Sequence, residues 1–171
     1  MENFNTTPFK LFKEFDYKAI AAASIGQVHK AELHTGEIVA IKIQYPNIEE
    51  VIANDLKNID YIKSLVRIIM PGHPKIDPIV EELKKSLIAE CDYDQEKQKM
   101  QEFKEMLKEE FPNILIPSSF SEFCTKRVLT MEYLEGETFD ETLEWGDKDK
   151  EEISQLYYHY YLYTVFYKRQ F

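Results

Sequence analysis

Two features of this sequence are suited to phosphate chemistry: a turn of small side chains and a lysine that follows it. Residues 20–28 read Ile-Ala-Ala-Ala-Ser-Ile-Gly-Gln-Val, and residues 39–42 read Val-Ala-Ile-Lys. A turn of small residues lets the backbone approach a ligand closely, and a lysine ammonium binds phosphate as a point charge. The stretch therefore predicts a phosphate-covering turn and a hairpin whose returning strand carries Lys42.

The spacing of this turn follows the glycine-rich phosphate loop of protein kinases, G-x-G-x-x-G-x-V. In that frame Ala21 and Ala23 occupy the first two glycine positions, Gly26 the third and Val28 the valine position. Alanine carries a Cβ that glycine lacks, so we expect a stiffer turn with less space beneath it. The loop residues predicted to bind nucleotide are Ala21, Ala22, Ala23, Ser24, Gly26 and Val28.

Lys42 is predicted to lie on the second strand of a β-hairpin formed by residues 27–33 and 38–44. Period-two alternation places Ala40 and Lys42 on one face of that strand. Ala40 is small enough there to admit a flat ring, and Lys42 can reach phosphates. Alternatively, the turn is only a run of small residues and Lys42 is an ordinary strand lysine. The occurrence of both features at kinase spacing favours a nucleotide site.

A carboxylate partner for Lys42 is predicted on a long helix that begins at Asp77 and Pro78 and ends near residue 110. The apolar residues of this helix form one stripe, and Glu90 falls inside it. The stripe consists of Ile79, Val80, Leu83, Leu87 and Cys91. A buried carboxylate needs a partner, and in kinases a glutamate on this helix pairs with the strand lysine. We therefore predict an ion pair between Lys42 and Glu90; the alternative is that Glu90 points into water.

The adenine side of the site is predicted where a strand-like run meets a glycine turn. Residues 127–131 have the composition of a strand, and Glu-Tyr-Leu-Glu-Gly follows them. In a kinase hinge, backbone N–H and C=O groups meet the adenine edge. This places Met131 behind the ring and Glu132, Tyr133 and Leu134 along its edge. The alternative is a strand that leads into a turn without a ligand.

Three stretches of the sequence resemble one known family. AAASIGQVHKAEL at 21–33, VAIKIQYP at 39–46 and ECDYDQEKQ at 90–98 are similar to the AarF/UbiB-type atypical kinases, which support coenzyme Q biosynthesis. The resemblance covers residues 15–171, and the alanine-rich loop is that family's own replacement for the glycine-rich loop. The K-x-G-Q motif that the family usually carries before the loop is absent from this sequence.

The resemblance implies a protein-kinase-like fold, Mg²⁺-dependent binding of ATP or ADP, and ATPase rather than general protein kinase activity. It also implies a lipid-linked role at a membrane surface, with membrane lipid or quinone-biosynthesis proteins as partners. Of the family's site residues Glu90 is carried over, while Asp92, Tyr93 and Glu96 match the acidic cluster that follows it by position only. The expected location is cytoplasmic or membrane-peripheral, on the inner membrane face in a bacterium, or mitochondrial in a eukaryote.

The remaining patterns predict an α+β fold, with a kinase-like small lobe and the first helices of a large lobe. Strand-like runs at 114–116 and 127–131 complete a five-stranded antiparallel sheet, and apolar spacing from Asn47 to Pro71-Gly72 predicts one or two helices. A short helix at 138–143 and a longer one at 147–171 follow. The predicted regions are a lead-in at 1–14, a small lobe at 15–131, a hinge at 132–137 and the start of a large lobe at 138–171.

Composition excludes several functional classes. The chain has 171 residues, enough for one domain with a core, and its formal net charge is −10. Because nucleic acid attracts basic surfaces, no nucleic-acid partner is expected. Cys91, Cys124 and four scattered histidines form neither a disulfide framework nor a zinc motif, so no metal site is predicted. The sequence shows no export signal and no apolar run of about 18 residues.

The groups that carry out phosphoryl transfer in kinases are not found in the sequence. Neither H-x-D-x-x-x-x-N nor D-F-G occurs, and these motifs supply the catalytic base and the metal ligands. We therefore interpret the chain as the ATP-binding portion of a UbiB-type kinase or ATPase, truncated before the catalytic loop, inactive alone, and partnered by the missing large lobe. The alternative is a non-catalytic pseudokinase module that binds nucleotide or a partner. A small-molecule phosphotransferase is disfavoured by the loop and by ECDY.

Overall fold

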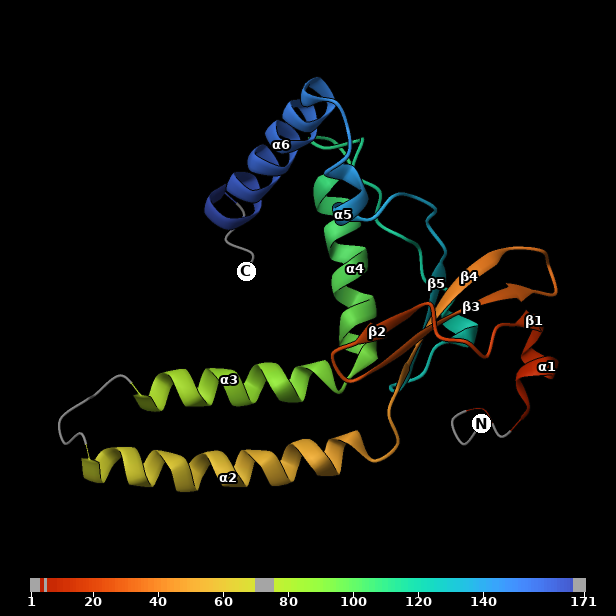
Figure 1. The fold of residues 1–171 in the computed structure, drawn as a ribbon. Helices are drawn as coiled ribbons and strands as arrows, with labels where there is room; N and C mark the ends of the chain where they lie inside the picture. The colour runs from red at the N-terminus through yellow and green to blue at the C-terminus, as the bar shows by residue number, and fades with distance from the viewer. Residues whose placement is uncertain (1–3, 5, 70–75, 168–171) are drawn as a thin grey trace. The chain divides into compact units, whose positions relative to one another are not determined.

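The computed structural model describes residues 4, 6–69 and 76–167, and its chain divides into two compact units. The first unit comprises Met1–Met106 and Leu115–Tyr133, and the second comprises Leu107–Ile114 and Leu134–Phe171. Figure 1 follows both units along the chain from red to blue. The division after Tyr133 falls within residues 132–137, where the hinge is predicted.

A five-stranded antiparallel sheet forms the centre of the first unit. Its strand order is β1-β3-β4-β5, and β2 also pairs with β3. The strands are β1 Phe12–Phe15, β2 Ala21–Ala23, β3 Gly26–Leu33, β4 Ile38–Gln44 and β5 Val128–Glu132. The short helix α1, Pro8–Leu11, precedes the sheet, and a 3₁₀ turn, Ser121–Phe123, precedes β5. The predicted α+β class, the antiparallel sheet and the β3–β4 hairpin are confirmed.

One of the predicted strands is wrong, because residues 114–116 form irregular chain. Leu115 is 71% exposed, and the proline that follows at 117 has no N–H to donate to a ladder. Pairing with β5 begins only after this proline, at a single bridge between Ser119 and Met131. The lead-in supplies the fifth strand instead, since Phe12 is buried in the core and β1 pairs with β3.

Alternation along β4 separates two hydrophobic clusters on opposite faces of the sheet. Val39 and Ile41 lie in one cluster, with Phe12 and other residues of the sheet. Leu129 of β5 lies in the other cluster, with residues of three helices, and it is the register partner of Lys42. Ala40 and Lys42 therefore share the helix-covered face, as the period of two predicts.

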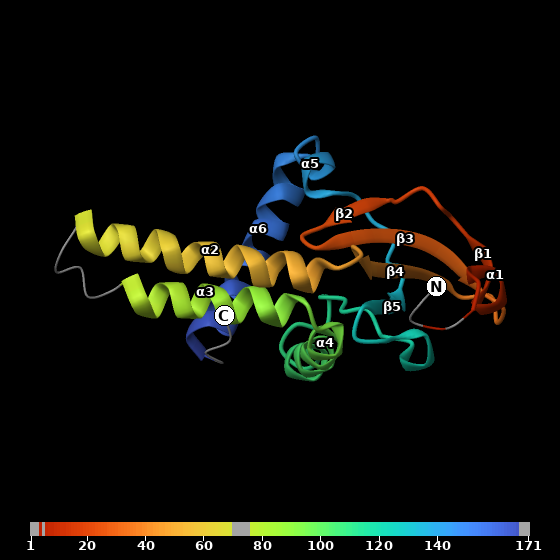
Figure 2. The ribbon, with the colours of Figure 1, turned by 90° about the horizontal axis from the view of Figure 1, so that it is seen from below.

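Three helices of the first unit follow the β3–β4 hairpin. They are α2 Ile48–Ile69, α3 Ile76–Glu90 and α4 Tyr93–Leu107. Figures 1 and 2 show α2 and α3 side by side as a helical hairpin. The predicted stop of the first helix at Pro71-Gly72 lies outside the described residues. The helix α2 buries Ile52 and Leu56 against Leu129.

The predicted single helix from residue 77 to about 110 is wrong, because it is two helices joined at Cys91 and Asp92. We call these two residues the elbow. Their N–H groups donate to carbonyls three residues back, so α3 closes in a tight turn. The Asp92 carboxylate then accepts a hydrogen bond from the Asp94 N–H at 3.1 Å, an N-cap arrangement that starts α4. Figure 2 shows the change of direction, with α4 seen end-on.

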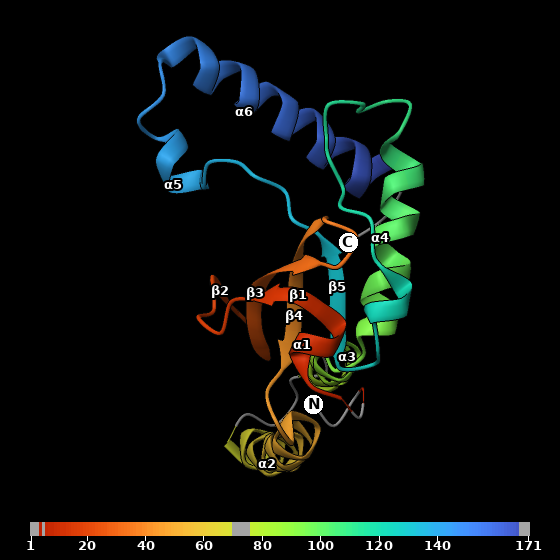
Figure 3. The ribbon, with the colours of Figure 1, turned by 90° about the vertical axis from the view of Figure 1, so that its right-hand side faces the viewer.

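The second unit contains a short and a long helix. They are α5 Phe139–Thr142 and α6 Asp147–Leu162, and a π-helical turn, Tyr163–Tyr167, continues α6. Thr138 and Glu141 form a capping box that starts α5, which confirms the predicted short helix. The ring of Phe111 contacts Tyr160 and Tyr163 at centroid distances of 6.1 and 5.3 Å, so part of the tyrosine-rich helix packs within its own unit. Figure 3 shows α6 along its length.

Candidate functional site

Lys42 is held by a glutamate from α4 on the helix-covered face of the sheet. Its Nζ donates to both carboxylate oxygens of Glu96, at 2.7 and 2.8 Å. The Lys42 side chain is only 16% exposed, and its Nζ lies 4.8 Å from the centroid of the Tyr93 ring. Contact with two oxygens and with an aromatic face fixes the position of the ammonium and the direction of its hydrogen bonds.

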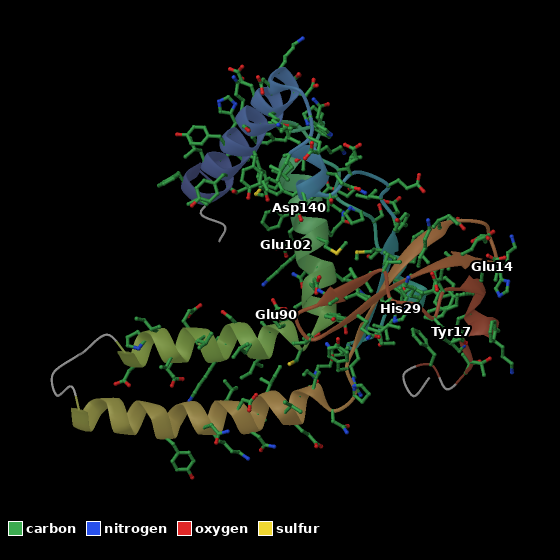
Figure 4. The ribbon with its side chains drawn as sticks, viewed as in Figure 1. Glu14, Tyr17, His29, Glu90, Glu102 and Asp140 are labelled. Carbon is green, nitrogen blue, oxygen red and sulfur yellow. The ribbon has the colours of Figure 1, made fainter. Side chains whose placement is uncertain are left out.

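The predicted pair between Lys42 and Glu90 is wrong, because the elbow ends α3 at Glu90 and redirects the chain before α4 begins. Glu96, one turn into α4, takes the place of Glu90 at the lysine. Glu90 instead accepts a hydrogen bond from Ser24 Oγ at 2.9 Å. Glu90 therefore ties the β2–β3 turn to the end of α3. Figure 4 labels Glu90 at that end of the helix. The contact of Glu90 with nucleotide stays a prediction.

Tyr93 places a phenol in the interior beside this ion pair. The residue is 1% exposed, and its hydroxyl has no hydrogen-bond partner among the residues that the structure describes. Burial first, and then the carboxylates of Glu96 and Glu90, raise the pKa of the Tyr93 phenol above its usual range. The ring thus contributes packing and a face for Lys42, while the hydroxyl is desolvated without compensation.

Tyr93→Phe is expected to raise the free energy of unfolding by about 1 kcal/mol, because it keeps the ring and removes the unpaired hydroxyl. The gain should increase above about pH 10, where an ordinary tyrosine ionises in the unfolded chain while the raised pKa keeps folded Tyr93 neutral. Urea denaturation of both proteins at neutral and alkaline pH measures the difference. A lower midpoint for the variant at neutral pH would show that the hydroxyl has a stabilising partner.

The small-residue turn is a short hairpin between β2 and β3. Ala21, Ala22 and Ala23 pair in register with Val28, Gln27 and Gly26. Ile25 at its tip is buried in the helix-covered cluster, and its carbonyl accepts the Tyr45 N–H at 2.9 Å. The turn is therefore anchored on both sides, by Ile25 to the core and by Ser24 to Glu90. The stiffness expected from alanine at the first two glycine positions stays a prediction.

Gly26 is required by the close approach of β4. A Cβ on Gly26 would lie 2.1 Å from the carbonyl oxygen of Ile43 and 2.8 Å from its carbonyl carbon. Both are backbone atoms of the paired strand, which cannot move away without opening the hairpin. Sheet packing thus explains the third glycine of the loop frame, and its contact with phosphate stays a prediction.

The predicted floor of the adenine site is formed by neighbouring strands. Ala40 is 7% exposed and is the register partner of Met131 on β5. Met131 packs partly buried against the cluster that contains Tyr93. The structure thus brings Ala40, Met131 and Lys42 onto one face of the sheet.

The backbone N–H groups of the first two predicted hinge residues, Glu132 and Tyr133, already donate hydrogen bonds within the protein. The Glu132 N–H donates to the Ser118 carbonyl at 2.9 Å, and the Glu132 carboxylate accepts the Ser118 N–H at 2.7 Å. The Tyr133 N–H donates to the Ile38 carbonyl at 3.2 Å. Leu134 belongs to the second unit. Contacts of Glu132, Tyr133 and Leu134 with an adenine ring stay predictions.

The structure was searched for metal ligands over the described part of the chain. Within residues 4, 6–69 and 76–167, no group of three or more His, Cys, Asp and Glu side chains is placed to hold a metal ion. Two glutamates of this region are already engaged, Glu96 by Lys42 and Glu90 by Ser24. No helix in the described part of the chain is both long enough and apolar enough to cross a membrane.

The sequence was compared with protein families and with known proteins. The sequence profile described as the ABC1 atypical kinase-like domain matches residues 1–171. The chain is 38% identical over 133 residues to "Atypical kinase coq-8, mitochondrial" of Caenorhabditis elegans, covering 78% of this chain and 17% of that protein. It is also 38% identical over 125 residues to "Atypical kinase COQ8, mitochondrial" of Saccharomyces cerevisiae, covering 73% of this chain and 25% of that protein.

A solved structure shares the fold. The complex of Rv3197 with erythromycin from Mycobacterium tuberculosis superposes with a TM-score of 0.71 at 29% sequence identity, covering 86% of this chain and 37% of that chain. The chain thus spans about a quarter or less of the two curated relatives and over a third of the solved one.

Proposed function

This chain belongs to the family of ABC1 atypical kinase-like domains, and on that premise we propose that its Lys42 binds the phosphates of ATP or ADP. The observation that carries the proposal is the contact of Lys42 Nζ with both oxygens of Glu96 at 2.7 and 2.8 Å. Lys42 is only 16% exposed in this pair, and kinases use a lysine–glutamate pair to hold the ammonium against phosphates.

Each of the neighbouring residues has a role in this proposal. Glu96 holds the ammonium of Lys42 in one direction, so that no side-chain ordering is needed when phosphate arrives. Ser24 at the turn places a hydroxyl over the phosphates, and the side chains of Ala40 and Met131 leave a flat apolar floor for the adenine. Mg²⁺ accompanies ATP in phosphoryl transfer and neutralises its charge. The described residues supply no ligand cluster for Mg²⁺, so we derive no step through it.

The finer function proposed for the whole protein is ATP use in the metabolism of ubiquinone or a related isoprenoid quinone. Identity of 38% to two COQ8 proteins supports it, as does the resemblance of the turn and the ECDY stretch to quinone-linked kinases. The corresponding partners are membrane lipid or quinone-biosynthesis proteins, at a peripheral position on a membrane. No feature of the chain favours nucleic acid, since its net charge is −10.

We expect residues 1–171 to bind a fluorescent ATP analogue but to release no phosphate above the buffer background. Binding follows from Lys42, while the motifs that supply the catalytic base and metal ligands are not in the sequence. Displacement titrations with ATP, ADP and AMP, together with a phosphate-release assay, measure both parts. ATP and ADP should compete better than AMP, because AMP lacks the β-phosphate that the corresponding kinase lysine contacts together with the α-phosphate.

Two results would contradict this expectation. Equal competition by AMP and ATP would place the phosphates away from Lys42. Phosphate release that survives further purification and disappears in Glu90→Gln would show that this chain contains catalytic groups outside the known kinase motifs. Binding without release, if it persists in a chain extended to the length of its relatives, would favour the pseudokinase module.

A further inference from the structure

We propose that Gln44 is a positioning residue for Lys42, because its side-chain amide holds the elbow and thereby sets which carboxylate the lysine meets. The importance of this for nucleotide binding rests on the proposed function. The positioning itself is a property of the fold and can be measured without a nucleotide.

Gln44 lies two residues after Lys42 on β4, so both side chains face the helices. The residue is 5% exposed, and its Nε2 donates to the carbonyl of Cys91 at 2.8 Å and to that of Lys126 at 3.4 Å. Two carbonyl oxygens face the amide, so its NH₂ group must point toward them. Its Oε1 is left buried without a partner among the described residues.

The two carbonyls connect Gln44 to both sides of the junction between α3 and α4, one directly and the other through Lys126. Cys91 is the first residue after α3, so Gln44 binds that end directly. The Lys126 carbonyl also accepts the N–H of Tyr93, the first residue of α4, at 2.9 Å. One amide therefore connects the strand that carries Lys42 to the end of one helix and, through Lys126, to the start of the next.

This connection determines the position of Glu96. Glu96 is one turn into α4, and the only chain between α3 and α4 is the elbow that Gln44 binds. Glu90, on the other side of the elbow, is directed to Ser24. Loss of the amide would remove the tie from β4 to the end of α3 and to the Lys126 carbonyl, and so loosen the hold of Glu96 on Lys42, while the sheet contacts of β4 remain. One face of β4 thus carries a row of three residues, Ala40, Lys42 and Gln44. In the proposals Ala40 lies under the adenine, Lys42 contacts the phosphates and Gln44 holds the elbow.

The test is the rate at which an acetylating reagent modifies Lys42, measured by mass spectrometry on the folded chain. In the wild-type chain the ion pair and burial protect the amine. Gln44→Met keeps the length of the side chain, removes the donor and also removes the unpaired Oε1, so the fold should tolerate it. We expect Lys42 labelling to rise several-fold in Gln44→Met, approaching the rate in Glu96→Gln. Lys13, paired with Glu32 on the sheet, should label at an unchanged rate as an internal reference.

The matched control is Gln27→Met, the same substitution at an exposed position of the neighbouring strand, which should leave Lys42 protected. Unchanged labelling of Lys42 in folded Gln44→Met would overturn the proposal. If Gln44→Met does not fold, the wild-type chain decides the question in low concentrations of urea. There the labelling of Lys42 should rise in parallel with hydrogen exchange of the Tyr93 N–H, and independent behaviour of the two would overturn the proposal.

A nucleotide titration separates this proposal from the proposed function. If the chain binds an ATP analogue, Gln44→Met and Glu96→Gln should weaken binding by similar factors, and the double variant should be no weaker than either. Additive losses would show that Gln44 acts independently of Glu96 and would contradict the proposal. Absence of binding in the wild-type chain would remove the proposed function, while the labelling result would still decide the role of Gln44.

Discussion

Lys42→Ala is expected to weaken the binding of an ATP analogue by ~1–3 kcal/mol, or about 5- to 150-fold in the dissociation constant. The reason is the loss of a charge-assisted hydrogen bond from an ammonium that the fold has already oriented with two glutamate oxygens. The fold should tolerate the change, because the Glu96 side chain is 36% exposed and can be solvated. Titration of the fluorescent analogue into the variant measures the effect.

The control for this variant is Lys13→Ala. Lys13 is also a strand lysine paired with a glutamate, but its side chain is 55% exposed and it lies on β1. The dissociation constant of Lys13→Ala should equal that of the wild-type chain. An unchanged constant in Lys42→Ala, with cooperative unfolding retained, would remove Lys42 from the site and with it the proposed phosphate contact.

Gly26→Ala is expected to lower the free energy of unfolding by about 3 kcal/mol, the upper end of what overpacking usually costs. The added methyl would sit 2.1 Å from the Ile43 carbonyl oxygen, so either the β3–β4 hairpin opens or the fold is lost. The opening would also move Gln44, the register partner of Gly26, and so disturb the elbow. The midpoint of urea denaturation, followed by circular dichroism, measures the loss.

Gly136→Ala provides the matched comparison. No atom lies within 4 Å of a Cβ at Gly136, and its φ is not in the left-handed region, so its unfolding free energy should stay within about 0.5 kcal/mol of wild type. A stable Gly26→Ala chain would mean that β4 can retreat from β3. In that case strand packing would not explain the glycine.

Because of the elbow, the β2–β3 turn and Lys42 interact with different glutamates. Because α3 ends at Glu90, the Ser24 hydroxyl has an acceptor that does not compete with Lys42. The loop can therefore be held without weakening the ion pair. An anchored turn and an oriented lysine are both forms of preorganisation, which reduces the entropy cost of binding.

Local features of this protein followed from the sequence alone. The hairpin of β3 and β4, the shared face of Ala40 and Lys42 and the antiparallel sheet depend on alternation and turn residues, which act over a few positions. The ECDYDQEKQ stretch contains both Glu96 and the wrongly predicted partner Glu90. The lead-in strand β1 was not predictable in this way, because it depends on pairing with β3 rather than on a pattern of its own.

Only the tertiary structure decided which glutamate meets Lys42. Apolar spacing continues from α3 toward the elbow, so the helical period predicts an unbroken helix with Glu90 inside its stripe. The break is stabilised by hydrogen bonds to residues far away in the chain. The Gln44 amide donates to the Cys91 carbonyl, and the Tyr93 N–H donates to the Lys126 carbonyl. The helical spacing of apolar residues carries information only about the segment in which it occurs. Contacts across 47 positions, such as that of Gln44 with Cys91, become visible only when the strand and the helices are brought together.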